Sequence, residues 1–314
     1  MIEKLRSRSW GIVTRRECSR SRPGAHVAPR LPSCSRVHAG YVPQYVRVSP
    51  ERDDDVPERH DRALLLFGSK RDAVLGLSEV QRYGADSFGD PDYVSVYGMR
   101  PAEWYARGIR LLGRSAVECT RDGLAQVIAR DIAATARSVQ SSEAPVVIDP
   151  FAGSGNTLYW IQRGLPGSRG IGFEVDAGVY RLTKRNLALI GAPIDVANVD
   201  YAAGLSSVTA PDGLVIVFVA PPWGDALDPA RGLDLRRTQP PVGDIIDMAA
   251  NRFPGTPLLF AIQVFERIEP SSLADASARC EWTLHQRYDL NETGQNHGLL
   301  LGTRGWIPAP EADR

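Results

Sequence analysis

From residue 141 to the C-terminus, short apolar runs alternate with segments whose apolar residues recur at helical spacing. Continuous apolar runs are typical of strands that are buried on both faces, and apolar residues at three- and four-residue steps are typical of helices. The predicted strands are 146–148, 170–173, 194–199, 214–219 and 257–264, with 282–290 and 299–303 as an antiparallel pair. The predicted helices are one that runs through Trp160, then 178–190, 244–252 and 273–279. This alternation predicts an α/β fold, a mainly parallel sheet with helices on both faces.

The first 140 residues divide into two parts of different character. Residues 1–60 are rich in Arg, Ser and Pro and lack periodicity, which predicts a leader without a packed core. From residue 100 to 137 the pattern becomes helical. Pro101 precedes Trp104, Tyr105, Ile109 and Leu112, and a second helix is predicted over 124–136. We therefore expect a basic leader over 1–62, a helical extension or lid over 63–140, and the sheet domain over 141–314.

The formal charge of the chain is zero but unevenly distributed. Residues 1–50 contain nine Arg and Lys4 against Glu3 and Glu17, a net charge of +8, so the remaining residues sum to −8. A basic end attracts phosphate or an acidic surface, although the same composition is typical of a solvated, disordered leader. Because RNA-binding proteins usually carry a basic face, the neutral total weighs against a large RNA footprint.

Composition also limits the class of protein. The longest clear apolar run, residues 214–220, is far shorter than the roughly 20 residues that span a bilayer, so no membrane helix is expected. The four Cys lie far apart with no Cys-x-x-Cys pair, which argues against a metal site and against a disulfide framework. The N-terminus lacks the apolar core of a secretory signal, so we expect a cytoplasmic protein. The oligomeric state stays open.

A Gly-rich turn, Asp149-Pro-Phe-Ala-Gly-Ser-Gly-Asn-Thr157, joins the first of these strands to a helix. It lacks the Lys of a phosphate-binding loop, and Leu158 stands where a dinucleotide fingerprint has its third Gly. An acidic residue at the strand end repels phosphate but suits a ligand with an ammonium group, such as S-adenosylmethionine. The alternative is an ordinary strand–turn–helix connection. To this cofactor we assign Asp149, Phe151, Gly153, Gly155, Asn156 and Thr157.

The next two strand ends continue the series of polar residues. Glu174 follows the second strand, where a carboxylate can accept hydrogen bonds from both ribose hydroxyls. Asp176 is interpreted as the cap of the following helix. After the third strand, Asp200 is placed to accept the exocyclic amine of adenine and Tyr201 to pack on the ring. For Asp200 the alternative is a surface turn.

A rigid turn, Ala220-Pro-Pro-Trp-Gly224, follows the most apolar strand. Two consecutive prolines cannot continue a central strand, so the carbonyls of Ala220 and Pro221 are free to accept hydrogen bonds from a substrate amine. Trp223 offers a flat face on which a planar ring can stack; the alternative is a turn capped by a buried Trp. The predicted catalytic residues are Ala220, Pro221, Pro222, Trp223 and Asp225, and either Asp225 or Asp228 receives the proton.

Together, the Gly-rich turn and the Pro-Pro-Trp turn resemble those of class I S-adenosylmethionine-dependent methyltransferases that act on amines, in particular the trimethylguanosine synthase type. The resemblance covers roughly residues 100–265. It implies a Rossmann-like seven-stranded methyltransferase sheet with a helical N-terminal extension. It also implies S-adenosylmethionine as cofactor. Two positions depart from the pattern: Ala220 replaces the Ser, Asp or Asn usual before Pro-Pro, and Asp225 replaces a second Gly after the Trp.

The sequence leaves three functions open. The first is N-methylation of an exocyclic amine on a guanine- or adenine-like base in RNA, a transfer that needs mainly positioning and desolvation. The second is methylation of a small planar metabolite, with the helical extension as a lid, and the missing acceptor at Ala220 favours it. The third is a non-catalytic protein that binds the cofactor or RNA. Arg231, Arg236 and Arg237 beside the turn are either a local phosphate grip or a solvated loop.

Overall fold

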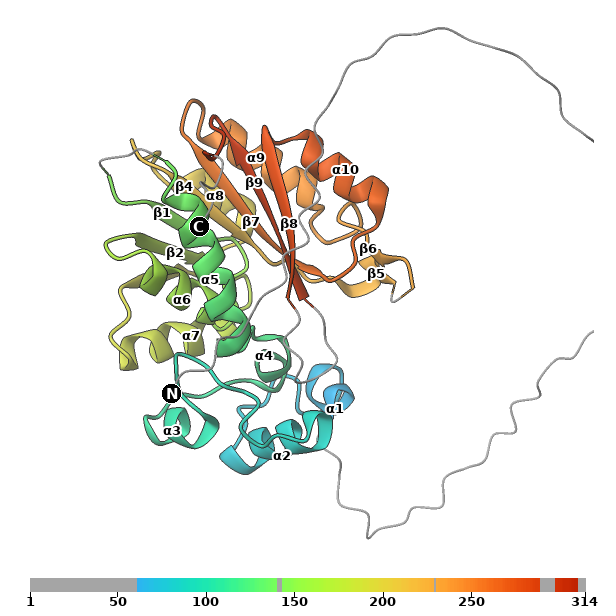
Figure 1. Cartoon of the computed structure of the whole chain (residues 1–314). Helices are drawn as coiled ribbons and strands as arrows, with labels where there is room; N and C mark the ends of the chain where they lie inside the picture. Colours follow the sequence, from blue (N-terminus) through green and yellow to red (C-terminus); the bar gives the residue numbers. More distant parts are fainter. Residues whose placement is uncertain (1–60, 140–142, 229, 289–296, 310–314) are drawn as a thin grey trace, which may run out of the picture. The chain divides into compact units, whose positions relative to one another are not determined.

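The fold is built on a seven-stranded sheet with the strand order β3-β2-β1-β4-β7-β9-β8 (Figure 1). The computed structural model describes residues 61–139, 143–228, 230–288 and 297–309. The strands are β1 (Val146–Asp149), β2 (Arg169–Phe173), β3 (Ile194–Ala197), β4 (Val215–Val219), β7 (Leu258–Phe265), β8 (Trp282–Tyr288) and β9 (His297–Arg304). The first five are parallel, and β9 pairs antiparallel with both β7 and β8. The predicted α/β class, the seven strands and the antiparallel C-terminal pair are confirmed.

The order of the strands reverses direction between β1 and β4. From β1 the chain moves outwards to β2 and β3, and it then returns to the other side of β1 with β4 and β7. At such a switch point the connections leave the two central strands in opposite directions, so a crevice opens beyond their carboxyl ends. The ends in question carry Asp149 and Ala220.

Helices cover both faces of the sheet. The helix before β1 is α5 (Asp122–Ala136), and those that follow are α6 (Asn156–Gly164), α7 (Ala177–Leu189), α8 (Tyr201–Ser207), α9 (Val242–Arg252) and α10 (Pro270–Ala278). Alternate residues of a strand point to opposite faces. Accordingly, Ile148 and Val217 share one core cluster with residues of α8, α9 and α10, while Val147 and Ile216 share another with α5 and α6. In Figure 1, α5 crosses in front of the strands.

Residues 61–121 form a helical layer with a core cluster of its own. Its helices are α1 (Arg62–Leu66), α2 (Leu77–Phe88), α3 (Pro101–Ala106) and α4 (Gly113–Glu118). The cluster contains the buried rings of Tyr83, Tyr97 and Trp104, and it also contains Leu187 of α7. The layer is therefore packed against the sheet domain through α7, which Figure 1 shows beside α3.

A buried carboxylate, Asp122 at the first residue of α5, joins the helical layer to the Gly-rich turn. It accepts hydrogen bonds from the Gly98 N–H (2.9 Å), from Nδ2 of Asn156 (3.1 Å) and from Nε1 of Trp160 (2.6 Å). The Asn156 side chain also accepts a hydrogen bond from the Tyr97 N–H at 2.7 Å. The side chains of Asp122 and Asn156 thus join the segment around Tyr97, the start of α5 and helix α6.

Two further polar contacts connect the layer to α7. The Asn186 side chain accepts a hydrogen bond from the Arg110 N–H (3.2 Å) and donates one to the Arg110 carbonyl (2.8 Å). The Arg114 guanidinium forms an ion pair of 2.6 Å with Asp176, the residue that caps α7. These contacts join the helical layer to α7 and to the residue that caps it.

Most predicted elements are present, with ends shifted by a few residues. Asp176 caps α7 as predicted. The third strand ends at Ala197, earlier than predicted, because Asp200 caps α8, a short helix that the sequence pattern did not reveal. The sequence analysis also missed the helices α1, α2 and α4. It missed the strands β5 (Leu227–Asp228) and β6 (Gly232–Leu233) as well, because two residues are too few to show a period. The leader 1–60 and residues 289–290 lie outside the described residues.

We expect Asp122→Ala to lower the free energy of unfolding by about 2–4 kcal/mol, because it leaves three donors in the interior without their acceptor. Denaturant unfolding followed by tryptophan fluorescence measures the change. The matched control is Glu281→Ala, an exposed carboxylate whose removal is expected to cost no more than about 0.5 kcal/mol. Equal losses of unfolding free energy in the two variants would show that the hydrogen bonds to Asp122 do not stabilise the fold.

Candidate functional site

The polar residues that follow the parallel strands lie along one edge of the sheet. β1 ends at Asp149, Glu174 follows β2, and Ala220 follows β4. β1 pairs in parallel with both β2 and β4, with Asp149 opposite Gly172 and Ile148 opposite Val217, so these three strand ends are neighbours. The structure therefore brings the predicted cofactor residues and the predicted acceptor residues to a common edge.

The two glycines of the Gly-rich turn have different physical roles. Both have left-handed backbone, with φ of 50° at Gly153 and 73° at Gly155, a conformation that disfavours other residues. A Cβ at Gly155 would lie 3.3 Å from Cγ2 of Thr183, so this glycine allows α6 and α7 to pack closely. A Cβ at Gly153 would approach nothing nearer than the Phe151 carbonyl oxygen at 3.8 Å. The open space at Gly153 is where a ligand can approach the backbone.

Asp149 is a buried carboxylate, 2% exposed, at the end of β1. Its Oδ1 accepts a hydrogen bond from the Phe151 N–H at 3.0 Å, and no other donor reaches the side chain from the described part of the chain. Burial raises the pKa of Asp149 to about 7, and the neighbouring charge of Glu174 acts in the same direction. The site therefore favours a cationic partner, which would stabilise the ionised carboxylate.

Glu174 connects the ends of β1 and β2. Its Oε2 accepts a hydrogen bond from the Gly153 N–H (3.1 Å), and its Oε1 accepts one from the Asp176 N–H (2.8 Å). Burial raises the pKa of Glu174, while these two backbone donors act against the shift. The carboxylate therefore holds the Gly-rich turn in place, and each oxygen keeps acceptor capacity for a ligand hydroxyl.

The end of β3 contributes an aromatic pair and a cap. Oδ1 of Asp200 accepts hydrogen bonds from the N–H groups of Ala202 (2.8 Å) and Ala203 (3.0 Å) at the start of α8. The ring of Tyr201 lies 5.6 Å from the ring of Phe151, centroid to centroid. This contact joins the turn after β1 to the end of β3. Oδ2 of Asp200 has no hydrogen bond within the described residues and remains available to a ligand donor.

Asn156 and Thr157 have side chains in the interior, 1% and 6% exposed. The Asn156 amide is fully used by the contacts to Tyr97 and Asp122 and by a hydrogen bond from Nδ2 to the Thr120 carbonyl at 2.7 Å. Any contact from Asn156 to a cofactor must therefore come from its backbone. Its role as a support of the turn could not be seen in the sequence, because its partners are distant along the chain.

The Pro-Pro-Trp turn follows β4, beside the end of β1. Within the described residues no donor is hydrogen-bonded to the carbonyls of Ala220 or Pro221, as the sequence predicts. Trp223 is half-buried and packs against the sheet core. Its ring lies 6.4 Å from the ring of Phe265, edge to face, and 6.1 Å from that of His297. Phe265 and His297 are residues of this region that the sequence analysis missed.

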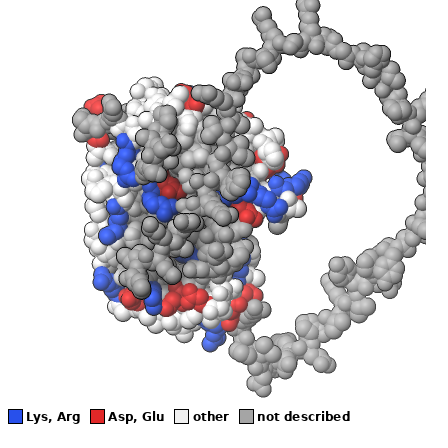
Figure 2. Space-filling view, viewed as in Figure 1, with Lys and Arg blue, Asp and Glu red and all other residues white. Residues whose placement is uncertain are grey.

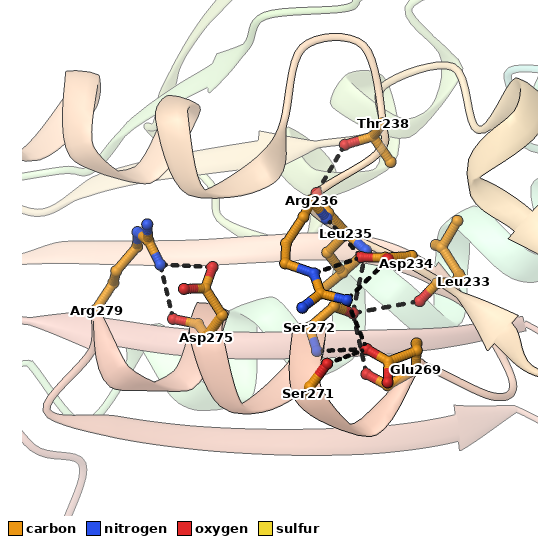
Figure 3. A network of polar contacts seen from close by, with 10 residues as sticks. All are labelled: Leu233, Asp234, Leu235, Arg236, Thr238, Glu269, Ser271, Ser272, Asp275 and Arg279. Atoms are coloured by element: carbon orange, nitrogen blue, oxygen red, sulfur yellow. Dashed lines mark hydrogen bonds and ion pairs between the residues drawn. The ribbon is translucent and has the colours of Figure 1, made fainter.

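The segment after the turn is fixed to the start of α10 by a polar network (Figure 3). Asp234 forms an ion pair of 2.9 Å with Arg236, and Arg236 forms a second ion pair of 3.0 Å with Glu269. The Leu235 N–H donates to the Ser272 hydroxyl at 3.1 Å. The network fixes the segment from Asp234 to Arg236 against the start of α10.

Two of the three arginines beside the turn already have carboxylate partners. Arg231 forms an ion pair of 2.7 Å with Asp228, and Arg236 is bound by Asp234 and Glu269. These partners neutralise their charge locally, so the interpretation as a solvated, self-paired loop is favoured for Arg231 and Arg236. Arg237 is exposed.

Other features of the described residues add little chemistry. No group of three His, Cys, Asp or Glu in them could hold a metal ion, and none of their helices is long and apolar enough to cross a bilayer. Burial raises the pKa of Cys119 to about 12 and that of Cys280 to about 11, which makes both thiols unreactive. A hollow of about 480 Å³ beside the start of α7 contains none of the predicted cofactor residues in its lining. We therefore locate the cofactor crevice by the strand ends.

Comparison with known proteins finds similarity in fold only. No protein-family model matches the chain, and no curated protein matches it. Among solved structures, the chain is similar to precorrin-6y C5,15-methyltransferase from Geobacter metallireducens, with 12% identity, 59% of this chain and 89% of that chain covered, and a TM-score of 0.38. It is also similar to a methyltransferase from Geobacter sulfurreducens, with 16% identity, 60% and 80% covered, and a TM-score of 0.37.

A third similar structure is the ribosomal protein L11 methylase from Lactobacillus delbrueckii subsp. bulgaricus, with 12% identity, 57% of this chain and 77% of that chain covered, and a TM-score of 0.33. These likenesses are distant. The strand order of the sheet and its flanking helices are those of a Rossmann-like methyltransferase fold.

The raised pKa of Asp149 predicts a pH-dependent stability. Between about pH 4 and pH 7 the folded protein binds a proton at Asp149 that the unfolded chain releases, so this group lowers stability as the pH rises through that window. From pH 5 to pH 8 we expect the wild type to lose about 2–3 kcal/mol relative to Asp149→Asn. Unfolding free energies of both proteins at the two pH values test this, and a parallel pH dependence would contradict it.

Proposed function

We propose that the protein is an S-adenosylmethionine-dependent N-methyltransferase that acts on an exocyclic amine of a guanine- or adenine-like base in RNA. The observation that carries the proposal is a pair of carboxylates, the buried Asp149 and the half-buried Glu174, at neighbouring strand ends beside the open backbone of Gly153. Within the described residues neither carboxylate has an Arg or Lys ion pair. A buried, unpaired carboxylate is costly, so a ligand that brings a cation and hydroxyl donors fits this edge.

The residues present fit this cofactor. Asp149 would hold its ammonium group and Glu174 its ribose hydroxyls, with Gly153 leaving room between them. Asp200 and Tyr201, with Phe151 against Tyr201, would receive the adenine. Of the other residues of the turn, Gly155 shapes the backbone, and Asn156 and Thr157 support it from inside. When bound, the cofactor supplies an electrophilic methyl group on its sulfonium.

The acceptor side of the site is the turn formed by Ala220, Pro221, Pro222 and Trp223. The two free carbonyls would hold the amine and direct its lone pair, while Trp223 stacks on the ring. Pro221 and Pro222 keep this geometry rigid because neither can rotate about φ. Fixed orientation of this kind is the main requirement for methyl transfer.

Asp225 is the better of the two candidates to receive the proton from the methylated amine. Arg231 lowers the pKa of Asp228 to about 2, so that carboxylate is a weak base. Asp225 is exposed on the Pro-Pro-Trp turn itself and has no ion pair within the described residues. Its exposure gives the proton a path to water.

A small planar acceptor is the second candidate function, and the paired arginines favour it. Arg231 and Arg236 are neutralised by carboxylates, which removes much of the expected grip on an RNA backbone. Figure 2 shows basic and acidic side chains interspersed on the visible face of the described residues. Labelled cofactor incubated with total RNA and, separately, with a cell metabolite extract distinguishes the two acceptors. If the protein bound the cofactor but transferred label to neither RNA nor metabolites, the non-catalytic alternative would be favoured.

We expect the protein to bind S-adenosylmethionine with a Kd of about 1 μM and Glu174→Ala to weaken binding by roughly tenfold or more, the equivalent of about 1.4 kcal/mol. Calorimetry measures both. Because Glu174 also holds the Gly-rich turn, Thr183→Val is the matched control. It removes the 2.5 Å hydrogen bond from the Thr183 hydroxyl to the Gly153 carbonyl but no proposed ligand contact. A wild type that does not bind, or an equal loss in both variants, would overturn the assignment of Glu174.

Trp223→Ala should reduce methyl transfer by roughly ten- to a hundredfold, since stacking on an aromatic side chain is worth about 1–3 kcal/mol. Trp223→Phe should restore part of the rate, and cofactor affinity should not change in either variant. Label transfer and calorimetry on the same preparations give the two readouts. If Trp223→Ala lost cofactor binding together with its thermal transition, Trp223 would be a core residue only.

A further inference from the structure

A buried histidine nitrogen beside Trp223 has no partner in the described part of the chain. His297 is the first residue of β9, and its Nδ1 is buried without a hydrogen bond. Its ring lies 6.1 Å from the ring of Trp223, centroid to centroid. A buried polar atom that gains no hydrogen bond costs about 1–3 kcal/mol, so native proteins rarely leave one without a reason.

The position of His297 in the sheet places it at the acceptor edge. It pairs directly with Phe265, the last residue of β7, and Phe265 in turn contacts the ring of Trp223. β9 is separated from β4 by one strand, β7. The register offsets Phe265 by two residues from the level of Ala220. Two strand spacings of about 4.8 Å and this step of about 3.3 Å per residue place His297 roughly 12 Å from Ala220, where the turn begins. That separation corresponds to a two-ring heterocycle with its amine at one end and the histidine at the other.

The chemical state of His297 suits a neutral contact. Burial lowers its pKa to about 4, and the nearby Arg121 guanidinium acts in the same direction. At neutral pH the imidazole therefore carries one N–H donor and one acceptor nitrogen and no charge. The neutral imidazole would not repel a cationic cofactor. It can donate a hydrogen bond to a ring nitrogen or a carbonyl, or accept one from a ring N–H.

We propose that Nδ1 of His297 binds the polar edge of the planar acceptor, opposite the amine that the Ala220 and Pro221 carbonyls hold. This inference rests on the proposed function and narrows its substrate class. The acceptor must be a ring system with a heteroatom on the edge remote from its methylated amine, such as a purine. A simple aminobenzene, which has only C–H groups there, would leave the nitrogen without a partner.

The chain offers a matched control in His285. Its Nε2 is also buried without a partner within the described residues, and burial lowers its pKa to about 4 as well. However, His285 pairs with Leu300, three residues along β9 from His297. Of the two histidines, only His297 has a ring contact with Trp223.

The test uses the full chain saturated with S-adenosylhomocysteine and titrated with guanosine and adenosine monophosphates. Calorimetry gives the affinities, and ¹⁵N NMR of the imidazoles, assigned with His297→Phe and His285→Phe, gives the contact. We expect at least one nucleotide to bind and to shift the His297 nitrogens while those of His285 stay unchanged. His297→Phe should weaken that nucleotide by about tenfold, His297→Asn should restore part of the affinity through its amide, and His285→Phe should have no effect. Thermal midpoints of the variants check that each is folded.

The outcomes separate the inference from the function on which it rests. Failure to bind S-adenosylhomocysteine would remove the proposed function itself. Binding of S-adenosylhomocysteine with no binding of either nucleotide would overturn the inference about the acceptor alone. So would a nucleotide that binds wild type and His297→Phe equally, or one that binds without moving the His297 nitrogens.

Discussion

The need to satisfy one buried carboxylate, that of Asp122, organises this fold. A carboxylate in the interior must be surrounded by donors, and Asp122 takes them from the helical layer and from α6. The same joint fixes Asn156, which in turn accepts the N–H of Tyr97. Tyr97 has a φ of 57°, a costly conformation for a residue with a side chain, and its N–H and its hydroxyl are both held, the latter by the Ser154 carbonyl.

The consequence of that joint is a Gly-rich turn held from both sides. From the inside, Asn156 and Ser154 tie it to the helical layer. From the other side, Glu174 after β2 accepts the N–H of Gly153, and Thr183 of α7 donates to the Gly153 carbonyl. The turn is thus preformed, with left-handed backbone at its glycines. Because a preformed site loses less entropy on binding, the contacts from the helical layer favour binding at this turn.

The two sides of the proposed site are built on different physical principles. On the proposed cofactor side, the central strand β1 ends in the buried carboxylate of Asp149, and a cation would relieve the cost of its burial. On the acceptor side, rigidity comes from two prolines, while the chain that follows is held by the Arg236 network at the start of α10. Trp223 and His297 belong to this second side. Their rings are in contact because β9, which begins at His297, lies only one strand from β4, which leads into the turn of Trp223.

Local patterns in the sequence were enough to determine the α/β class, the parallel strands and the residues at their ends. Strand and helix periods are local properties, and so are the turn at Gly153, the cap at Asp176 and the break at Pro221. The strand order was not local, nor were the contacts that give Asn156 a supporting role, pair Arg236 with Glu269 and set His297 beside Trp223. Each of these joins residues tens of positions apart. Only packing of the sheet and its helices decides such contacts, since a sequence period records which face a residue occupies but not what lies across from it.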